Sequence, residues 1–428
     1  MTLDAQAAVP AEGKAKPKAP SLWRNRDFNL LWVSQCFSAL GSGITGLAYP
    51  LAVLVLTHSA VAAGAVGTVA MVVRTVLRLP AGVLVDRVNR RRLMLACDAI
   101  RLTIFVLLGV AMLTSYASLP LILAVAVVES VCSVGFEGAE MSAVRNLVPM
   151  DQVSTAVARN EARSAGVSLV GPPLGGALFS LGRAVPFLAD ALSYLFSLGG
   201  LLLIRRPFQE ADRKAPTTSP LHDLVEGLRF VVGEPFLRAS MLIAPAINFA
   251  LNGMIFGLIL LLQRNGTPPV LIGTIETAVG VGAMVGAVLA GQLLRRLSTA
   301  TLVRVICVIG VPLLLAVLPF ANSPLAGAPL TLVMLVAPAL NAGLFGYLAA
   351  VTPDRLQGRV TSALMTAAMS LAALAPLVAG LLVNHFGAVG VVLGFTAAYA
   401  VGACFALFSK GIRTMRPVGE QSAVEGEA

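Results

Sequence analysis

Charged side chains are scarce in this chain. Only 12% of its 428 residues are Asp, Glu, Lys or Arg, whereas about 25% is usual for soluble proteins. Aromatic residues make up 6% of the chain and hydrophobic residues 57%. So few charges cannot cover a water-exposed surface of this size, which excludes a cytosolic enzyme, a disordered chain and a nucleic-acid-binding domain.

Residues that build metal, redox and nucleotide sites are also few. The 5 cysteines lie singly in apolar runs without a CxxC spacing, as is typical of small buried side chains. The three histidines, His58, His222 and His385, are far apart in the sequence. No GxxxxGK[ST] segment is present. The sequence therefore predicts no metal, no cofactor, no integral-membrane enzyme and no ATP-driven pump.

Long hydrophobic runs dominate what remains. A helix needs about 20 apolar residues to cross a bilayer, and an open strand would leave backbone groups unsatisfied in lipid. We therefore expect an all-α membrane protein with twelve transmembrane helices. The expected spans are residues 30–56, 61–84, 93–114, 118–142, 162–181, 186–204, 239–262, 270–294, 301–320, 328–350, 360–383 and 389–409.

The basic residues indicate the orientation. Most of the 31 Lys and Arg residues fall on the side of the expected spans that holds both termini, and only Arg183 and Arg264 fall on the other side. Cytoplasmic loops carry such an excess of positive charge. We expect a multi-pass protein of the plasma membrane with both termini cytoplasmic. The net charge of +10 then reports topology and does not indicate nucleic-acid binding.

The longest hydrophilic segment between spans divides the chain into two sets of six spans. It contains an amphipathic stretch, Leu221 to Val232, suited to a membrane surface. Weak internal similarity, such as "AGVLVDRVNRRRLM" and "LAGQLLRRLSTATLV", supports two pseudo-symmetric six-helix bundles. The expected parts are a tail (1–27), a bundle (28–204), a linker (205–237), a second bundle (238–409) and a tail (410–428).

Two motifs are the most informative. The expected loop after the second span, residues 82–93, combines one glycine, one aspartate and four arginines: Gly82, Asp86, Arg87, Arg90, Arg91 and Arg92. Asn89 there tolerates a positive φ. The fifth span contains Gly171, Pro172, Gly175 and Gly176, where proline would kink the helix and small residues would permit close packing.

The loop motif resembles the "GxLaDrxGrr" signature of the major facilitator superfamily, with Asn89 in place of the usual glycine. The motif in the fifth span is similar to the "gxxxGPxxGG" motif of exporters in that superfamily, with its leading glycine displaced. Further stretches, among them "CDAIR" and "TPDRLQGRVTSAL", resemble the macrolide-efflux and enterobactin-exporter-like branch. The resemblance implies that Asp86 and the arginines latch the cytoplasmic face closed, and that the fifth span seals the cytoplasmic half.

Ionisable residues inside the expected spans are candidates for substrate or proton sites, because a charge in hydrocarbon is costly. They are Arg74, Arg78, Asp98, Arg101, Glu129 and Asp190. Asp98 and Arg101 are one helical turn apart and can pair. Asp190 and Glu276 are placed near the outer ends of their spans, where Asp190 would face water. Glu129 has two readings: a carboxylate in the cavity that exchanges protons, or a permanent structural partner of Arg74.

These observations predict a secondary-active exporter, expected to be a monomer. A cavity with few fixed charges and several candidate aromatics would suit an amphipathic small-molecule substrate. Protons are the expected coupling ion, and the lipid bilayer surrounds the protein. The aromatics are Phe37, Tyr49, Phe249, Phe256, Phe345 and Tyr347. Two alternatives stay open: an importer or facilitator of the same superfamily, and a dedicated siderophore exporter.

Overall fold

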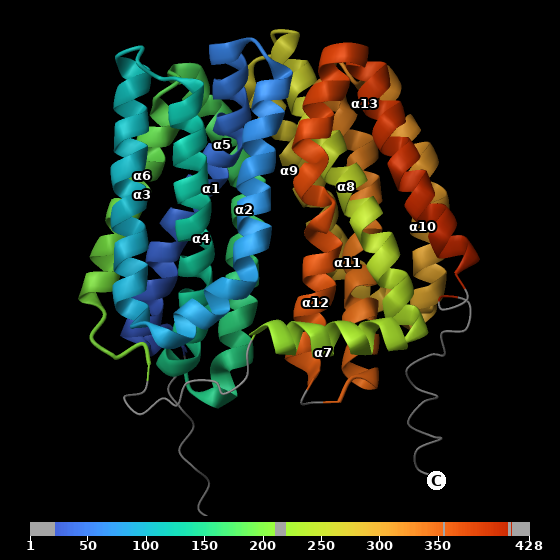
Figure 1. Ribbon diagram of the computed structural model, residues 1–428, viewed down its shortest axis with the longest axis horizontal. Coiled ribbons are helices and arrows are strands. Elements are labelled where there is room, and N and C mark those ends of the chain that lie inside the picture. Colours follow the sequence, from blue (N-terminus) through green and yellow to red (C-terminus); the bar gives the residue numbers. More distant parts are fainter. Residues whose placement is uncertain (1–21, 210–219, 354–355, 410–411, 413–428) are drawn as a thin grey trace, which may run out of the picture.

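The computed structural model describes residues 22–209, 220–353, 356–409 and 412, which form helices without any strand (Figure 1). The expectation of an all-α protein is confirmed. The α-helices of the first half are α1 (Arg26–Thr57), α2 (Ala60–Arg87), α3 (Arg90–Leu113), α4 (Leu119–Leu147), α5 (Val153–Leu181) and α6 (Val185–Leu203). The later ones are α7 (Pro220–Gly233), α8 (Pro235–Arg264), α9 (Pro269–Arg296), α10 (Thr299–Leu315), α11 (Gly327–Val351), α12 (Gln357–Ser370) and α13 (Ala375–Phe408).

The described helices fall into two bundles that repeat one packing scheme (Figure 1). In the first bundle α1 packs on α5 and α6, α2 packs on α4, and α3 packs on α4 and α6. In the second bundle α8 packs on α12 and α13, α9 packs on α11, and α10 packs on α11 and α13. Each contact of one bundle thus has its counterpart in the other, which confirms two pseudo-symmetric bundles.

The last two expected spans lie in one long helical segment of the structure. Among the described residues, 11 helical segments are long and apolar enough to cross a membrane, and one of them, Gln357–Phe408, has 52 residues. Gly387 interrupts that segment with φ 60° and ψ −145°, a conformation that favours glycine. The expected break between 383 and 389 is therefore confirmed, and it divides this segment into two spans.

A second interruption in this segment was not expected. The backbone tightens into a 3₁₀ turn at Ala372–Leu374, between α12 and α13. Pro376 follows at the start of α13, and its ring nitrogen offers no N–H to the preceding turn.

Helix α7 runs across the second bundle at one end, nearly perpendicular to the other helices (Figure 1). It packs on α8 and α12, and Glu226 of α7 forms an ion pair with Arg359 of α12. The expected amphipathic stretch is therefore helical. The boundaries of the expected bundles, tails and linker stay a prediction, and residues 1–21 and 413–428 of the expected tails lie outside the described residues.

The two bundles meet mainly along four helices. We call the end with the α2–α3 turn (Val88–Asn89) the basic end and the end with the α1–α2 turn (His58–Ser59) the opposite end. Helix α5 contacts α9, and α2 contacts α13. Hydrogen bonds that join the bundles run from Thr277 Oγ1 to the Leu169 carbonyl at 2.9 Å and from the Leu377 N–H to Thr68 Oγ1 at 3.0 Å.

The prediction of a loop over residues 82–93 was wrong. Helix α2 continues to Arg87 and α3 begins at Arg90, so the turn contains Val88 and Asn89 alone. Asn89 has a φ of −69°, not a positive value, and its side chain accepts a hydrogen bond from the Arg92 N–H. Asparagine is favoured as a helix N-cap, which explains why no glycine is needed here.

Candidate functional site

Two adjoining cavities lie where the bundles face each other. The first has about 380 Å³ and is lined mainly by α1, α2 and α4, with Phe256 of α8 and Met369 of α12, and the second has about 710 Å³ and is lined mainly by α1, α5, α8 and α9. Gly46, Met71 and Phe256 line both, so the two form one central space. Its size suits a drug-sized molecule, for which pockets of roughly 300–1,000 Å³ are usual.

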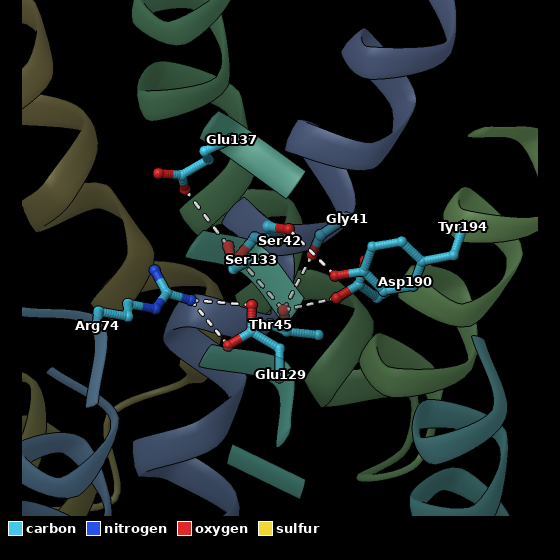
Figure 2. Close-up of polar contacts among 9 residues, drawn as sticks. All are labelled: Gly41, Ser42, Thr45, Arg74, Glu129, Ser133, Glu137, Asp190 and Tyr194. Carbon is cyan, nitrogen blue, oxygen red and sulfur yellow. Dashed lines mark hydrogen bonds and ion pairs between the residues drawn. The ribbon is translucent and has the colours of Figure 1, made fainter. Parts of the chain in front are cut away.

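An ion pair lines the first cavity. The Nη2 atom of Arg74 donates to both carboxylate oxygens of Glu129, at 2.9 and 2.8 Å (Figure 2). The Arg74 side chain is 45% exposed and that of Glu129 is 7% exposed. The pair thus joins α2 to α4 while its guanidinium stays accessible from the cavity. Both interpretations of Glu129 from the sequence are compatible with this geometry, because Glu129 pairs with Arg74 and also lines the cavity.

Two further polar groups of the first cavity have no partner among the residues that the structure describes. Arg78, one helical turn beyond Arg74, lines it without an ion pair among the described residues. The Tyr49 hydroxyl is buried and has no hydrogen-bond partner in this part of the chain. Both groups are available to a bound molecule.

Asp190 does not face water as expected, because α6 turns it into the first bundle, where it is 0% exposed. Its carboxylate accepts a hydrogen bond from Thr45 Oγ1 at 2.9 Å (Figure 2) and another from Ser193 Oγ at 3.0 Å. Gly41 makes the room, since a Cβ there would collide with Asp190 and Ser193. Thr45 lines the first cavity, so one hydroxyl separates Asp190 from it.

Asp98 and Arg101 pair with each other as expected, at 2.6 Å. Ser197 Oγ also donates to Asp98, at 2.5 Å, and Gln35 donates to Ser197 at 2.9 Å. The Arg101 guanidinium lies 4.6 Å from the ring centroids of both Phe136 and Tyr194. Neither Asp98 nor Arg101 lines either cavity, so this network ties together α1, α3, α4 and α6.

The arginines of the expected latch divide into two kinds. Arg90 is 5% exposed and donates to the carbonyls of Ser142 and Phe208, at 3.3 and 3.2 Å. Arg91 donates to the carbonyls of Leu201 and Leu202, at 3.2 and 3.0 Å. Both therefore hold the first bundle together. Arg87 and Arg92 are exposed at the basic end. The side chains of Gly82 and Asp86 lie outside the described part of the structure.

The small residues of the fifth span lie at close helix contacts, as expected. A Cβ on Gly171 would lie 3.0 Å from Gly43 Cα, and one on Gly175 would collide with the Ile44 carbonyl, both on α1. A Cβ on Gly176 would collide with the Pro269 carbonyl of α9. Pro172 lines the second cavity, and α5 continues as a helix past it.

Sequence reasoning missed one cavity residue. Glu276, which was placed near the outer end of its span, lines the second cavity from α9. Its position between Gly273 and Gly280, both at the α5 contact, was the available signal. Of the six candidate aromatics, Tyr49 and Phe256 line the described cavities. Phe37 instead stacks on Phe196.

Two curated proteins resemble this chain over most of their length. The multidrug efflux pump Tap of Mycolicibacterium fortuitum is 27% identical over 377 residues, which cover 81% of this chain and 87% of Tap. The uncharacterized transporter YkuC of Bacillus subtilis (strain 168) is 23% identical and covers 79% of this chain and 81% of its own.

Solved structures share the fold at lower identity. A bacterial homologue of the human lysosomal transporter Spinster, inward-facing and unoccupied, superposes with a TM-score of 0.67 at 15% identity, over 92% of this chain and 97% of its own. The nucleoside transporter NupG does so with a TM-score of 0.70 at 12% identity, over 90% and 100%.

The family model described as Major Facilitator Superfamily matches residues 31–376, which is most of the chain. Two bundles with one packing scheme, a cavity between them and matches to transporters agree with that result and indicate transport rather than catalysis. This chain belongs to the Major Facilitator Superfamily.

Proposed function

We propose that this protein is a secondary-active exporter of drug-like or secondary-metabolite molecules, driven by protons through alternating access. The central space between the bundles supports this proposal most directly, because it combines apolar walls with the Arg74–Glu129 pair. The likeness to the efflux pump Tap favours export over import.

The orientation follows from the charges. The arginine-rich basic end faces the cytoplasm of a plasma-membrane protein, and both termini lie on that side. The hydrogen bonds Thr277–Leu169 and Leu377–Thr68 lie toward the opposite end. In this arrangement the outer side is closed and substrate enters from the cytoplasm.

Coupling runs through Glu129. Protonation of its carboxylate removes the negative charge that neutralises Arg74, so the ion pair weakens and α2 is released from α4. Asp190, behind Thr45, is a second carboxylate within reach of the cavity through one hydroxyl. The latch of the outward-open state comprises Asp86 with Arg87 and Arg92, because Arg90 and Arg91 are engaged within the first bundle.

Accumulation of a fluorescent drug in intact cells tests the direction. Cells that overproduce the protein should hold less drug than cells that lack it, and collapse of the proton gradient should remove the difference. More drug in overproducing cells would show import, and equal accumulation for a broad set of drugs would contradict export of this substrate class.

A further inference from the structure

Glu276 occupies a distinctive place in the second cavity. It lies on α9 within one helical turn of Gly273 and Gly280, which both contact α5. A Cβ on Gly273 would lie against the Pro172 carbonyl, and one on Gly280 would lie 3.1 Å from Leu169. Glu276 therefore stands at the edge of the seam between the two bundles, with its side chain in the cavity.

The carboxylate of Glu276 has no hydrogen bond or ion pair among the described residues. Its polar neighbours on the cavity wall are engaged elsewhere. Ser168 Oγ donates to the Ser164 carbonyl at 3.0 Å, and Asn252 Nδ2 donates to the Asn248 carbonyl at 2.8 Å. By contrast, Glu129 and Asp98 are each paired with an arginine. An unpaired ionisable group at membrane depth indicates a binding site.

No other ionisable side chain among the described residues lines the second cavity. The remaining wall is mostly apolar, with Met71, Ile255, Phe256 and Met284 among its residues. The cavity holds about 710 Å³, enough for a drug-sized molecule. One negative charge among apolar walls matches one positive charge carried on a large hydrophobic body.

The arginines that line the first cavity do not neutralise the carboxylate of Glu276. Arg74 is neutralised by Glu129. Arg78 lies eleven residues, or ~16 Å, along α2 from Gly67 toward the basic end. A Cβ on Gly67 would touch Pro376, which lines the second cavity. Arg78 is therefore displaced along the membrane axis from Pro376, and it does not line the second cavity.

We propose that Glu276 is the counter-ion for a lipophilic organic cation bound in the second cavity. The inference rests on the proposed function for the direction of transport and adds the charge class of the substrate. The Phe256 ring, on the same wall, offers a face for a cation–π contact. Because α5 and α9 part at this seam when the outer side opens, the carboxylate lies on the route that the cation takes.

Equilibrium binding of radiolabelled tetraphenylphosphonium to the purified full-length protein tests this assignment. This probe is a permanent cation, and no gradient is applied. Glu276→Gln should weaken binding by at least about tenfold, the loss of one charged contact. Glu276→Asp keeps the charge and should stay within about threefold. Glu161→Gln, which removes an exposed carboxylate of α5 that lines neither cavity, should bind like the wild type.

The outcomes separate this inference from the proposed function. Phe256→Leu gives a second variant with an uncharged change, and it should weaken tetraphenylphosphonium binding about three- to fivefold. Binding that depends on Glu276 without any export upholds the site and contradicts the exporter. Export of a neutral drug together with tetraphenylphosphonium binding that is absent, or equal in wild type and Glu276→Gln, overturns the site and leaves the exporter standing.

Discussion

Arg74 on α2 donates through one nitrogen to both carboxylate oxygens of Glu129 on α4, at 2.9 and 2.8 Å, on the wall of the central cavity. The pair is thus both a tie between two helices and a charge that a proton can remove. It is the feature on which the proposed coupling depends.

Glu129→Gln should therefore separate coupling from binding. We expect export driven by a pH gradient to fall at least about tenfold, whereas exchange of labelled for unlabelled substrate without a gradient should stay within about twofold. Both rates are measured in proteoliposomes. Glu137→Gln is the control, since Glu137 lies two turns further along α4 and lines neither cavity. Unchanged gradient-driven export in Glu129→Gln would remove Glu129 from the coupling mechanism.

Gly41→Ala should destabilise the first bundle. The new Cβ would collide with the buried carboxylate of Asp190 and with Ser193, and overpacking of this kind costs about 1–3 kcal/mol. Thermal unfolding followed by fluorescence in detergent measures the effect as a lower Tm. Gly46→Ala is the matched control on the same helix, because a Cβ there has open space within 4 Å. Equal Tm values for the two variants would contradict the packing described around Asp190.

Arg90→Ala and Arg92→Ala should behave differently although the residues are two positions apart. Arg90 is buried and bonds two carbonyls, so its removal should lower the free energy of unfolding by about 1.5–3 kcal/mol. Arg92 is exposed, so its removal should stay within about 0.5 kcal/mol yet slow turnover. Tm and transport rate are measured on the same preparations. A large loss of stability in Arg92→Ala, or none in Arg90→Ala, would contradict a structural role for Arg90 and a latch role for Arg92.

Asp86→Asn tests the latch from its acidic side. With the carboxylate removed, the cytoplasmic face should fail to close, so turnover should be lost while expression and Tm stay normal. Wild-type transport rates in this variant would remove the latch from the mechanism.

A cysteine pair at Leu169 and Gly280 should lock the outer side closed. A Cβ on Gly280 would lie 3.1 Å from the Leu169 side chain, so a disulfide can join α5 to α9 there once the five native cysteines are replaced. Oxidation should abolish transport and a reductant should restore it, as alternating access requires these helices to part. Each single cysteine serves as a control. Full transport by the quantitatively cross-linked protein would show that the α5–α9 contact does not open.

The sequence predicted how deep a residue lies in the membrane better than it predicted which side of its helix a side chain occupies. Apolar runs and the Asp98–Arg101 spacing depend on residues close in the chain, so the span order and this pair were correct. Asp190 was misjudged for a different reason. Asp190, Ser193 and Ser197 recur at helical spacing on α6, but this pattern does not show whether their face meets water or another helix. Only the packing of α1 on α6, with Gly41 against Asp190, decides the orientation of Asp190.

The prediction of a long loop between α2 and α3 was wrong because a cluster of charged residues was taken to indicate a loop. Four arginines and an aspartate lie close together there, but arginine is a good helix former, and Asn89 caps α3. The roles of Arg90 and Arg91 were also hidden, since their partners are carbonyls more than 50 residues away in the sequence.

Uptake of a fluorescent substrate into everted membrane vesicles tests the central claim most directly. The basic end then faces the bath, and acidification of the vesicle interior supplies the driving force. Proton-driven export through the central cavity predicts uptake that follows the imposed pH gradient, stops when the gradient is collapsed and is lost in Glu129→Gln. Uptake of the same size without a gradient, or with Glu129→Gln under a full gradient, would contradict proton-driven export through this cavity.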